Sequence, residues 1–336
     1  MISAKFQNEA IEKDYLRFKS DWKKNDSIQV LTSGSTGEPK KILIAKEKMI
    51  LSANKTIRFF NLQDRVDALV CLSLNTIAGK MMLARAFVGK WNLTIVEPAV
   101  NPLLNSDENI DFLALVPLQL ERILIECPDK IRQIETVIVG GAPVSNSLIN
   151  LLKENEMTVY QTFGMTETVS HIALRKIGKE TDAFYKTVDG AEVSDLDGNL
   201  IIHYPEMFEE PLRTNDLVKI ISPKQFEWLG RSDYMINSGG VKLNPEKIEQ
   251  KLSELIPYSF FITGLKDDRL GQKLALVIEN NSNFIPEKVR FQSVLDKFEL
   301  PKVYINVKEF DRTKSGKVNR IKTIQNIQSN DWKAII

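Results

Sequence analysis

The sequence predicts an α/β fold: a large N-terminal domain with a mostly parallel, helix-covered sheet and a small antiparallel β subdomain, then a small α+β C-terminal domain. Three observations predict it. Between residues 28 and 160, short β-rich runs alternate with helix-like stretches. After Thr181, closely spaced strands show hairpin signals, and after Asp233 helices and strands mix again. We therefore expect domains at residues 1–232 and 233–336.

The N-terminal part is expected to open with an amphipathic helix, because Ile11, Tyr15, Phe18 and Trp22 recur at helical spacing. The expected strands of the sheet are residues 28–33, 67–73, 93–98, 112–117, 136–141 and 157–162, and two of the expected helices are residues 47–60 and 118–126. In such a sheet, ligands bind at the carboxyl ends of the strands.

Hairpin turns are expected at Asp197-Gly198 and at Ser222-Pro223, which gives the small antiparallel subdomain. Beyond Asp233 the pattern predicts helices and strands of a separate domain. Its expected helices are residues 245–255 and 286–298, and its expected strands are residues 259–265, 273–279 and 303–310.

Composition excludes several classes of protein. The 45 Lys and Arg residues and 44 Asp and Glu residues leave a net charge of +1, so overall charge does not indicate nucleic acid or a membrane surface as a partner. Cys71 and Cys127 lie far apart without metal-ligand spacing. The N-terminus lacks signal-peptide order, and no long uncharged apolar run occurs. We expect a cytoplasmic protein that binds small molecules.

The strongest local motif follows the first predicted strand, in residues 31–41, LTSGSTGEPKK. Its glycines let the backbone approach a polyphosphate, its N–H groups and hydroxyls can donate to phosphate oxygens, and lysine offsets their charge. The motif is not a Walker A loop, because Pro39 stands where that loop requires glycine. A glycine- and serine-rich surface turn is the alternative.

Five further segments place glycines or polar side chains at expected strand ends or at the domain join. They are GGAP at 140–143, YQTFGMTET at 160–168, TND at 214–216, the stretch from Gly230 to Glu246, and DRTKSGKVNR at 311–320. The first offers a tight turn beneath a planar base. The second offers an aromatic ring, a hydroxyl and a carboxylate together, and the third offers a carboxylate for ribose hydroxyls.

This ordered set of motifs, from Val30 to Arg320, resembles the adenylate-forming superfamily of acyl-CoA synthetases, peptide-synthetase adenylation domains and luciferases. Two finer stretches, IAGKMM at 77–82 and GMTETVSHIALR at 164–175, are similar to short o-succinylbenzoate–CoA ligases of menaquinone biosynthesis. The resemblance implies an ATP- and Mg²⁺-dependent ligase that forms an acyl-adenylate and transfers the acyl group to CoA.

The resemblance also implies roles for individual residues. The β- and γ-phosphates would be held by Thr32, Ser33, Gly34, Ser35, Thr36, Gly37 and Lys40. Adenine would lie against Gly140, Gly141, Ala142 and Phe163, beside Gly164 and Met165. Thr166 would contact the α-phosphate, Glu167 would hold Mg²⁺, and Asp216 and Arg231 would bind the ribose.

Lys317 is expected to be the catalytic cation that bridges the acyl carboxylate and the α-phosphate in the first half-reaction. The resemblance further implies that the C-terminal domain is mobile and rotates about Asp233 between the half-reactions. Rotation would bring a loop containing Ser238, Gly239, Gly240 and Lys242 to the CoA side of the site.

The acid substrate of this resemblance carries two carboxylates, so its pocket needs donors beyond those for the reacting group. Candidates for the acyl pocket are Asn75, Lys80, Arg85, Ser170 and His171, whereas His203 is expected to be structural. Alternative functions are a ligase for another aryl or acyl acid, a stand-alone amino-acid adenylating enzyme, and a nucleotide-binding protein without catalysis.

The sequence departs from the family's pattern at its start. Only 31 residues precede Thr32, where the family has a much longer segment. We therefore expect a homodimer or the opening helix to cover the sheet that this segment would otherwise cover.

Overall fold

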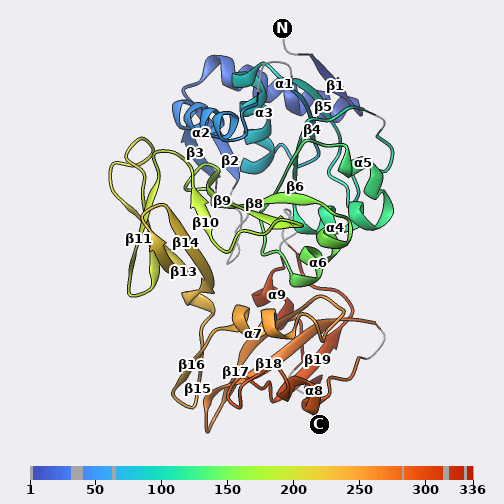
Figure 1. Cartoon of the computed structure of the whole chain (residues 1–336), viewed down its shortest axis with the longest axis vertical. Helices are drawn as coiled ribbons and strands as arrows, with labels where there is room; N and C mark the ends of the chain where they lie inside the picture. The colour runs from blue at the N-terminus through green and yellow to red at the C-terminus, as the bar shows by residue number, and fades with distance from the viewer. Residues whose placement is uncertain are drawn as a thin grey trace.

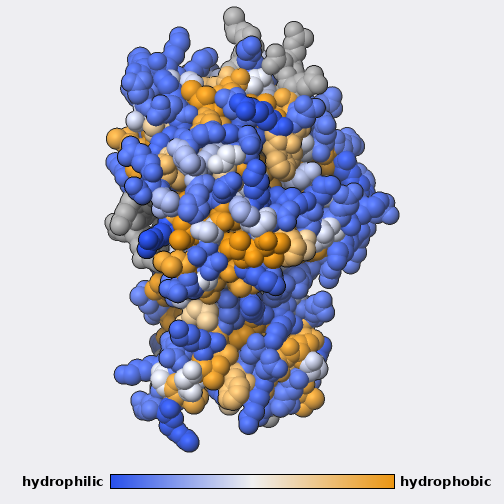
Figure 2. Space-filling view, turned by 60° about the vertical axis from the view of Figure 1, so that its left-hand side comes forward, coloured by the Kyte–Doolittle hydropathy of each residue, from blue (hydrophilic) through white to orange (hydrophobic). Residues whose placement is uncertain are grey.

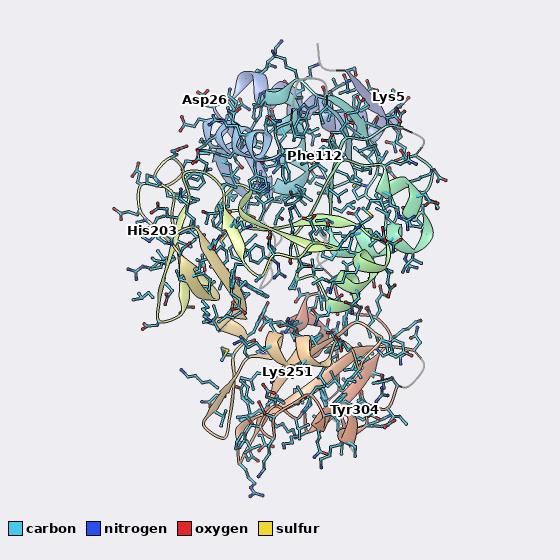
Figure 3. All side chains as sticks on the ribbon, viewed as in Figure 1. Lys5, Asp26, Phe112, His203, Lys251 and Tyr304 are labelled. Carbon is cyan, nitrogen blue, oxygen red and sulfur yellow. The ribbon has the colours of Figure 1, made fainter. Side chains whose placement is uncertain are left out.

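The computed structural model describes residues 3–31, 41–62, 66–106, 108–281, 284–312, 318–328 and 331–335. Figure 1 shows a larger lobe above a smaller one. The larger lobe contains a twelve-stranded sheet and the smaller lobe a six-stranded sheet. Figure 3 places the side chain of Phe112 inside the larger lobe, and Lys251 and Tyr304 in the smaller lobe.

Half of the large sheet is parallel. Its strands, in spatial order, are β1 (Ala4–Phe6), β5 (Asn92–Ile95), β4 (Asp67–Val70), β6 (Phe112–Leu115), β7 (Thr136–Val139) and β8 (Thr158–Gly164). Alternate residues of these strands enter different apolar clusters: Ala68 and Val70 belong to one, and Leu69 to the other. A strand that is apolar on both faces must be covered on both faces.

Helices provide that cover. One cluster contains residues of α1 (Glu9–Lys24), α2 (Lys46–Phe59) and α3 (Ile77–Gly89). The other contains residues of α4 (Pro117–Glu126), α5 (Pro128–Arg132) and α6 (Asn146–Glu154). The predicted opening helix is confirmed: Asn8 caps α1, and Ile11, Tyr15 and Phe18 are its buried residues. The helices predicted at 47–60 and 118–126 are α2 and α4.

The predicted antiparallel strands are confirmed, and they continue the large sheet instead of forming a separate one. They are β9 (His171–Gly178), β10 (Tyr185–Thr187), β14 (Gln225–Arg231), β13 (Leu212–Ser222), β12 (Asn199–His203) and β11 (Glu192–Leu196), in spatial order. The join is the antiparallel pair β8–β9, which runs from Thr158↔Gly178 to Gly164↔His171. Asp197 and Gly198 turn between β11 and β12 with φ of 53° and 81°, as the hairpin signal predicts.

One expectation was wrong. Residues 28–31 do form a strand, β2 (Ser27–Leu31), but β2 is not part of the large sheet. It pairs antiparallel with β3 (Lys41–Ala45) in a two-stranded sheet. The burial pattern gives the reason: Ile28 and Val30 are buried whereas Gln29 between them is exposed. A hairpin that rests one face on the core has this alternation, and a central parallel strand does not.

The smaller lobe mixes helices and strands, as predicted. Its strands are β15 (Ile236–Ser238), β16 (Val241–Leu243), β17 (Phe260–Asp267), β18 (Gly271–Glu279), β19 (Val303–Val307) and β20 (Lys333–Ala334). Its helices are α7 (Pro245–Leu252), α8 (Lys288–Gln292) and α9 (Arg320–Gln325). The helix expected at 286–298 is shorter: after Gln292, the N–H groups of Ser293 and Val294 donate to the carbonyls of Arg290 and Phe291, three residues back, at 3.3 Å and 3.2 Å.

A single 3₁₀ turn, η1 (Ser232–Tyr234), lies between β14 and β15 and contains Asp233. The division into domains at 1–232 and 233–336 stays a prediction. The lobes touch in this structure, since Asn244 Nδ2 donates to the Leu229 carbonyl at 2.8 Å and Asn146 Nδ2 donates to the Gln250 carbonyl at 3.4 Å. None of the helices in the described part of the chain combines the length and the hydropathy that spanning a bilayer requires.

Candidate active site

The carboxyl ends of the parallel strands form the candidate site. The order β5-β4-β6-β7-β8 changes direction between β4 and β6, and ligands of open α/β sheets bind beside such a reversal. Leu31, the last residue of β2, forms a parallel bridge with Thr76, the residue that caps α3. Leu31 also pairs with Lys41, so the chain leaves and re-enters the β2–β3 hairpin at this end of the sheet.

Several predicted residues lie outside the described part of the chain. They are Thr32, Ser33, Gly34, Ser35, Thr36, Gly37 and Lys40 of the phosphate motif, and Lys317. Their roles stay predictions.

The turn after β7 requires glycine. A Cβ on Gly140 would collide with the Thr162 hydroxyl on β8, and Gly141 has a φ of +85°, which L side chains rarely adopt. The Gly140 N–H donates to the Leu115 carbonyl at 3.0 Å, which holds the turn against the end of β6. The backbone of the turn at residues 140–142 therefore carries no side chain at its first two positions, Gly140 and Gly141.

The loop between β8 and β9 is held in a strained shape. A Cβ on Gly164 would collide with the Ser170 carbonyl, and Val169 has a φ of +65°, which is unfavourable for a β-branched residue. The buried Thr168 hydroxyl accepts from the Met165 N–H at 2.9 Å and lies 2.6 Å from the Ser170 carbonyl oxygen. These contacts close the two ends of the loop onto each other.

The middle of this loop presents Thr166 and Glu167. Glu167 is exposed and, among the described residues, makes no hydrogen bond or ion pair. Its carboxylate is therefore available to a cation. Phe163, which precedes the loop, packs edge-on against Tyr185 and Phe226, with ring centroids 5.7 Å and 5.2 Å away.

Asp216 and Arg231 face each other across the β13–β14 pair. The buried Asp216 carboxylate accepts from Trp228 Nε1 at 2.9 Å, and its other oxygen lies 3.9 Å from Arg231 Nη1. Burial raises the pKa of Asp216, while its hydrogen bond with Trp228 and the Arg231 charge oppose that rise. Arg231 also donates to both oxygens of Asp233, at 2.9 Å and 2.8 Å, which lowers the pKa of Asp233. The predicted ribose residues and the predicted hinge residue are thus one connected group.

Three of the five acyl-pocket candidates belong to one buried group of contacts. Arg85 on α3 is only 2% exposed, and its Nη2 donates to Ser170 Oγ at 2.7 Å. Its Nε donates to Thr56 Oγ1 at 3.2 Å, and Thr56 also contacts His171 Nε2 at 3.2 Å. No acidic side chain among the described residues pairs with Arg85. Burial lowers the pKa of Arg85 to about 10, so it stays charged at neutral pH.

His171 is uncharged in this environment. Burial, followed by the neighbouring Arg85 charge, lowers the pKa of His171 to about 3. Thr56, which contacts both Arg85 and His171, was not among the predicted site residues. Its position on the buried stripe of α2, one turn beyond Ser52 and beside Ala53, was the signal that could have found it.

The other two acyl-pocket candidates do not join this group through any hydrogen bond in the described chain. The Lys80 ammonium donates to the Gln29 carbonyl and so ties α3 to β2. Burial lowers the pKa of Lys80. Asn75 is exposed, and its N–H donates to Ser73 Oγ at 3.4 Å.

The predicted CoA-side loop is the β15–β16 hairpin of the smaller lobe. Gly239 and Gly240 occupy its turn with φ of 60° and 82°, and the Gly239 N–H donates to the Leu270 carbonyl at 2.8 Å. Ser238 and Lys242 flank the turn. Figure 1 shows this hairpin at the lower left of the smaller lobe, away from the strand ends of the large sheet.

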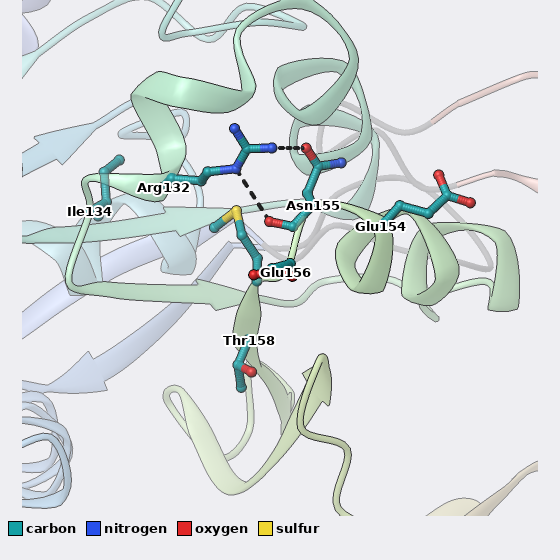
Figure 4. Close-up of a pocket in the computed structure, with 7 residues that line it drawn as sticks. Arg132, Ile134, Glu154, Asn155, Glu156 and Thr158 are labelled. Carbon is teal, nitrogen blue, oxygen red and sulfur yellow. Dashed lines mark hydrogen bonds between the residues drawn. The ribbon is translucent and has the colours of Figure 1, made fainter.

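One surface hollow lies away from the candidate site. Figure 4 shows one hollow, of about 470 Å³, lined by residues that include Arg132, Glu154, Asn155 and Thr158. Thr158 begins β8, so this hollow lies at the opposite end of the strand from Gly164. Arg132 bridges to Asn155 across it, with hydrogen bonds of 3.3 Å and 2.9 Å. Figure 2 shows a mainly hydrophilic surface with apolar residues gathered on the large lobe above its junction with the smaller lobe.

Comparisons with known proteins fit this geometry. The family model of the AMP-binding enzyme matches residues 4–196. A 2-succinylbenzoate–CoA ligase of Listeria monocytogenes is 26% identical over 321 residues, which cover 87% of this chain and 68% of that protein.

Two solved structures have similar folds. The crystal structure of an acyl-CoA synthetase (AMP-forming)/AMP-acid ligase II-like protein from Dyadobacter fermentans has 36% identity and a TM-score of 0.64, with 96% of this chain and 95% of that chain covered. The o-succinylbenzoate coenzyme A synthetase (MenE) of Bacillus subtilis, in complex with ATP and magnesium ion, has 20% identity and a TM-score of 0.75, with 88% and 69% covered. The first of these two chains is similar to this one along nearly its whole length.

Proposed function

The chain belongs to the AMP-binding enzyme family, and from that premise we propose that it is an ATP-dependent, AMP-forming ligase that joins o-succinylbenzoate to CoA. The carboxylate of the acid attacks the α-phosphorus of ATP, and pyrophosphate leaves. The CoA thiol then attacks the acyl carbon, its proton is lost, and AMP leaves. This reaction would serve menaquinone biosynthesis in the cytoplasm.

The observation that carries the choice of acid is the buried Arg85. A buried guanidinium without a carboxylate partner is unfavourable, and an anionic ligand removes that penalty. Thr56 engages Nε, Ser170 engages Nη2 and Met82 Sδ engages Nη1, so one N–H group on Nη1 and one on Nη2 are available to a ligand. O-succinylbenzoate has a second carboxylate on its ring, which Arg85 can bind while the succinyl carboxylate reacts.

The nucleotide is proposed to bind across the ends of β7 and β8. The glycine turn at 140–141 leaves room for the flat adenine base, with Phe163 as the neighbouring aromatic ring. Thr166 on the closed loop would contact the α-phosphate. Asp216 and Arg231 would bind the ribose, and their contact across β13 and β14 supports a joint role.

Glu167 fits a magnesium ion. It is an exposed carboxylate without a partner in the described chain, and Mg²⁺ favours one or two carboxylates together with phosphate oxygens and water. The described residues contain no group of three or more metal ligands, which agrees with an ion that phosphate oxygens help to hold. When bound, Mg²⁺ would neutralise charge on the phosphates.

The smaller lobe is proposed to supply different residues for the two half-reactions. Lys317 would stabilise the charge that shifts between the acyl carboxylate and the α-phosphate. Rotation of residues 233–336 about Asp233 would then withdraw Lys317 and bring Ser238, Gly239, Gly240 and Lys242 to the site for the CoA step. The Arg231–Asp233 pair would have to open or follow this rotation, because it spans the proposed hinge.

The test compares two acids: o-succinylbenzoate and its analogue that lacks the ring carboxylate. Pyrophosphate release and CoA-thioester formation are measured separately for the wild type and for Arg85→Met. We expect the wild type to favour o-succinylbenzoate by about 100-fold in kcat/KM, since truncating one partner of a buried charge pair removes roughly 2–5 kcal/mol. Arg85→Met should lose most of that preference and keep its rate with the analogue.

Three results would contradict the proposal. Equal use of the two acids by the wild type would remove the role of Arg85. Pyrophosphate release without any thioester would indicate an adenylating enzyme of another kind. A failure of every acid to release pyrophosphate would favour a nucleotide-binding protein without catalysis.

A further inference from the structure

We propose that Thr56 is a positioning residue for recognition of the acid: its hydroxyl fixes the direction of the Arg85 guanidinium and the tautomer of His171. This inference rests on the function proposed above, because it concerns the same acyl pocket. Thr56 does not contact the substrate itself. It acts only by positioning Arg85 and His171.

Thr56 connects three elements at one atom. It is 0% exposed on α2, and its Oγ1 lies 3.1 Å from the Ser52 carbonyl oxygen on the same helix. The same oxygen lies 3.2 Å from Arg85 Nε on α3 and 3.2 Å from His171 Nε2 on β9. A buried hydroxyl with three polar neighbours from three elements has no freedom to rotate without losing a hydrogen bond.

Counting protons decides the direction of each bond. A hydroxyl has one proton to donate and two lone pairs to accept with. Arg85 Nε can only donate, and the Ser52 carbonyl can only accept. All three contacts are hydrogen bonds only if Thr56 donates to Ser52 and accepts from both Arg85 and His171.

This assignment puts the ring proton of His171 on Nε2 and leaves Nδ1 as an acceptor. The alternative tautomer would make Thr56 donate to His171 and give up its bond to Ser52. The charged groups around His171 agree with a single ring proton, since Arg85 is the cation beside it and no carboxylate among the described residues contacts the ring.

The same bond orients Arg85. Thr56 holds Nε at 3.2 Å, Ser170 holds Nη2 at 2.7 Å and Met82 Sδ lies 3.8 Å from Nη1, so three contacts fix the plane of the guanidinium. The N–H groups that remain then point in one direction, which suits a planar carboxylate. Without the Thr56 hydroxyl, the guanidinium could turn about its Ser170 contact.

The test replaces the hydroxyl while keeping the shape of the side chain. Thr56→Val removes the hydroxyl, Thr56→Ser keeps it, and Thr136→Val is the matched control, because Thr136 is also buried but lies at the start of β7. Initial rates are measured with o-succinylbenzoate, with the analogue that lacks the ring carboxylate, and with varied ATP.

We expect Thr56→Val to raise the KM for o-succinylbenzoate about 10-fold, as for one lost hydrogen bond to a charged group, with kcat and the ATP KM unchanged. Thr56→Ser should restore the KM to within about twofold, and Thr136→Val should not raise it. The KM for the analogue should be the same in all variants. A merely structural role would change the KM for both acids and for ATP together, and that result would overturn the inference.

A second measurement observes the His171 ring in the wild type directly and needs no substitution at Thr56. The sequence has 2 histidines, so nitrogen NMR of the wild-type rings can be assigned with His203→Asn. We expect the proton of His171 on Nε2, and a proton on Nδ1 would overturn the inference. If the wild type does not use o-succinylbenzoate, the proposed function fails, and the ring tautomer still decides the inference about Thr56.

Discussion

Two largely buried arginines have opposite surroundings. Arg320 on α9 donates to Glu249 Oε2 at 2.8 Å and lies over the rings of Tyr234 and Phe261, 5.2 Å and 5.4 Å from their centroids. Arg85 on α3 has two hydroxyl oxygens and a thioether sulfur as partners in the described chain, and no carboxylate. Both side chains carry a charge and are largely buried, with 2% of Arg85 and 18% of the Arg320 side chain exposed.

The difference separates a structural charge from a binding charge. Arg320 and Glu249 neutralise each other, so either one without the other would be an uncompensated buried charge. Arg85 has polar partners that orient it and leave its charge unbalanced. A protein retains such an arrangement where a ligand supplies the missing anion, which is why we place the ring carboxylate of the acid at Arg85.

The largest expected effect is the contrast in stability between Arg320→Met and Arg85→Met. Removing Arg320 should lower the free energy of unfolding by about 3–5 kcal/mol, because Glu249 is left buried and unpaired. Removing Arg85 should leave it within roughly 1 kcal/mol of the wild type or raise it, because no buried anion is left behind. Urea unfolding at neutral pH measures both.

A similar decrease in the free energy of unfolding for Arg320→Met and Arg85→Met would contradict this distinction. That result would mean that Arg85 already has an anionic partner in the folded chain. The acid KM provides the converse control, since it should rise in Arg85→Met and change little in Arg320→Met.

The second prediction concerns how the free energy of unfolding depends on pH through His171, the neighbour of Arg85. The pKa of His171 is about 3 in the folded state and about 6.5 when unfolded, so between these values the unfolded chain binds a proton that the folded chain does not. The contribution of His171 to stability is therefore complete above pH 6.5 and falls as the pH decreases. Between pH 7 and pH 5, the wild type should lose about 2 kcal/mol more than His171→Gln in urea unfolding. Parallel pH profiles for the two proteins would contradict this expectation.

The third effect concerns the pH dependence of stability on the Arg320 side and has the opposite sign. Burial raises the pKa of Glu246 to about 7; the Arg320 charge opposes this rise and the Glu249 charge adds to it. The folded state then binds the proton between pH 4.5 and pH 7, so stability should fall as the pH rises through this range. Glu246→Gln should remove that slope in thermal unfolding followed from pH 5 to pH 8. A slope that persists in the variant would assign it to another group.

The sequence predicted those elements whose hydrophobic periodicity or turn residues determine their secondary structure. The parallel strands, the opening helix and the hairpin at Asp197-Gly198 follow from local pattern and turn chemistry. Pattern does not name a strand's partner, so it could not reveal that β9 joins the antiparallel strands to the large sheet, or that β2 pairs with β3 outside it. Those pairings depend on contacts between distant segments.

The candidate site was predictable to a similar extent. Turn signals placed Gly140 and Glu167 directly after strands, where the structure has them. Asp216 was expected to close a strand and instead lies inside β13, because the pairing of β13 with β14 continues past it. Periodicity could place Thr56 on the buried face of α2, but it could not place Thr56 against Arg85 and His171, because those contacts depend on how α2 packs against α3 and β9.

The register shift between Phe163 and Gly164 has a consequence for how this protein can change. Residues 165–170 leave one strand and return in its antiparallel neighbour, so the ladder below the irregularity is complete without them. Lengthening or shortening this connection by a residue should leave the rest of the sheet assembled while displacing Thr166 and Glu167. Such a change should therefore weaken the step that uses ATP and magnesium, for every acid alike, while the scaffold stays folded.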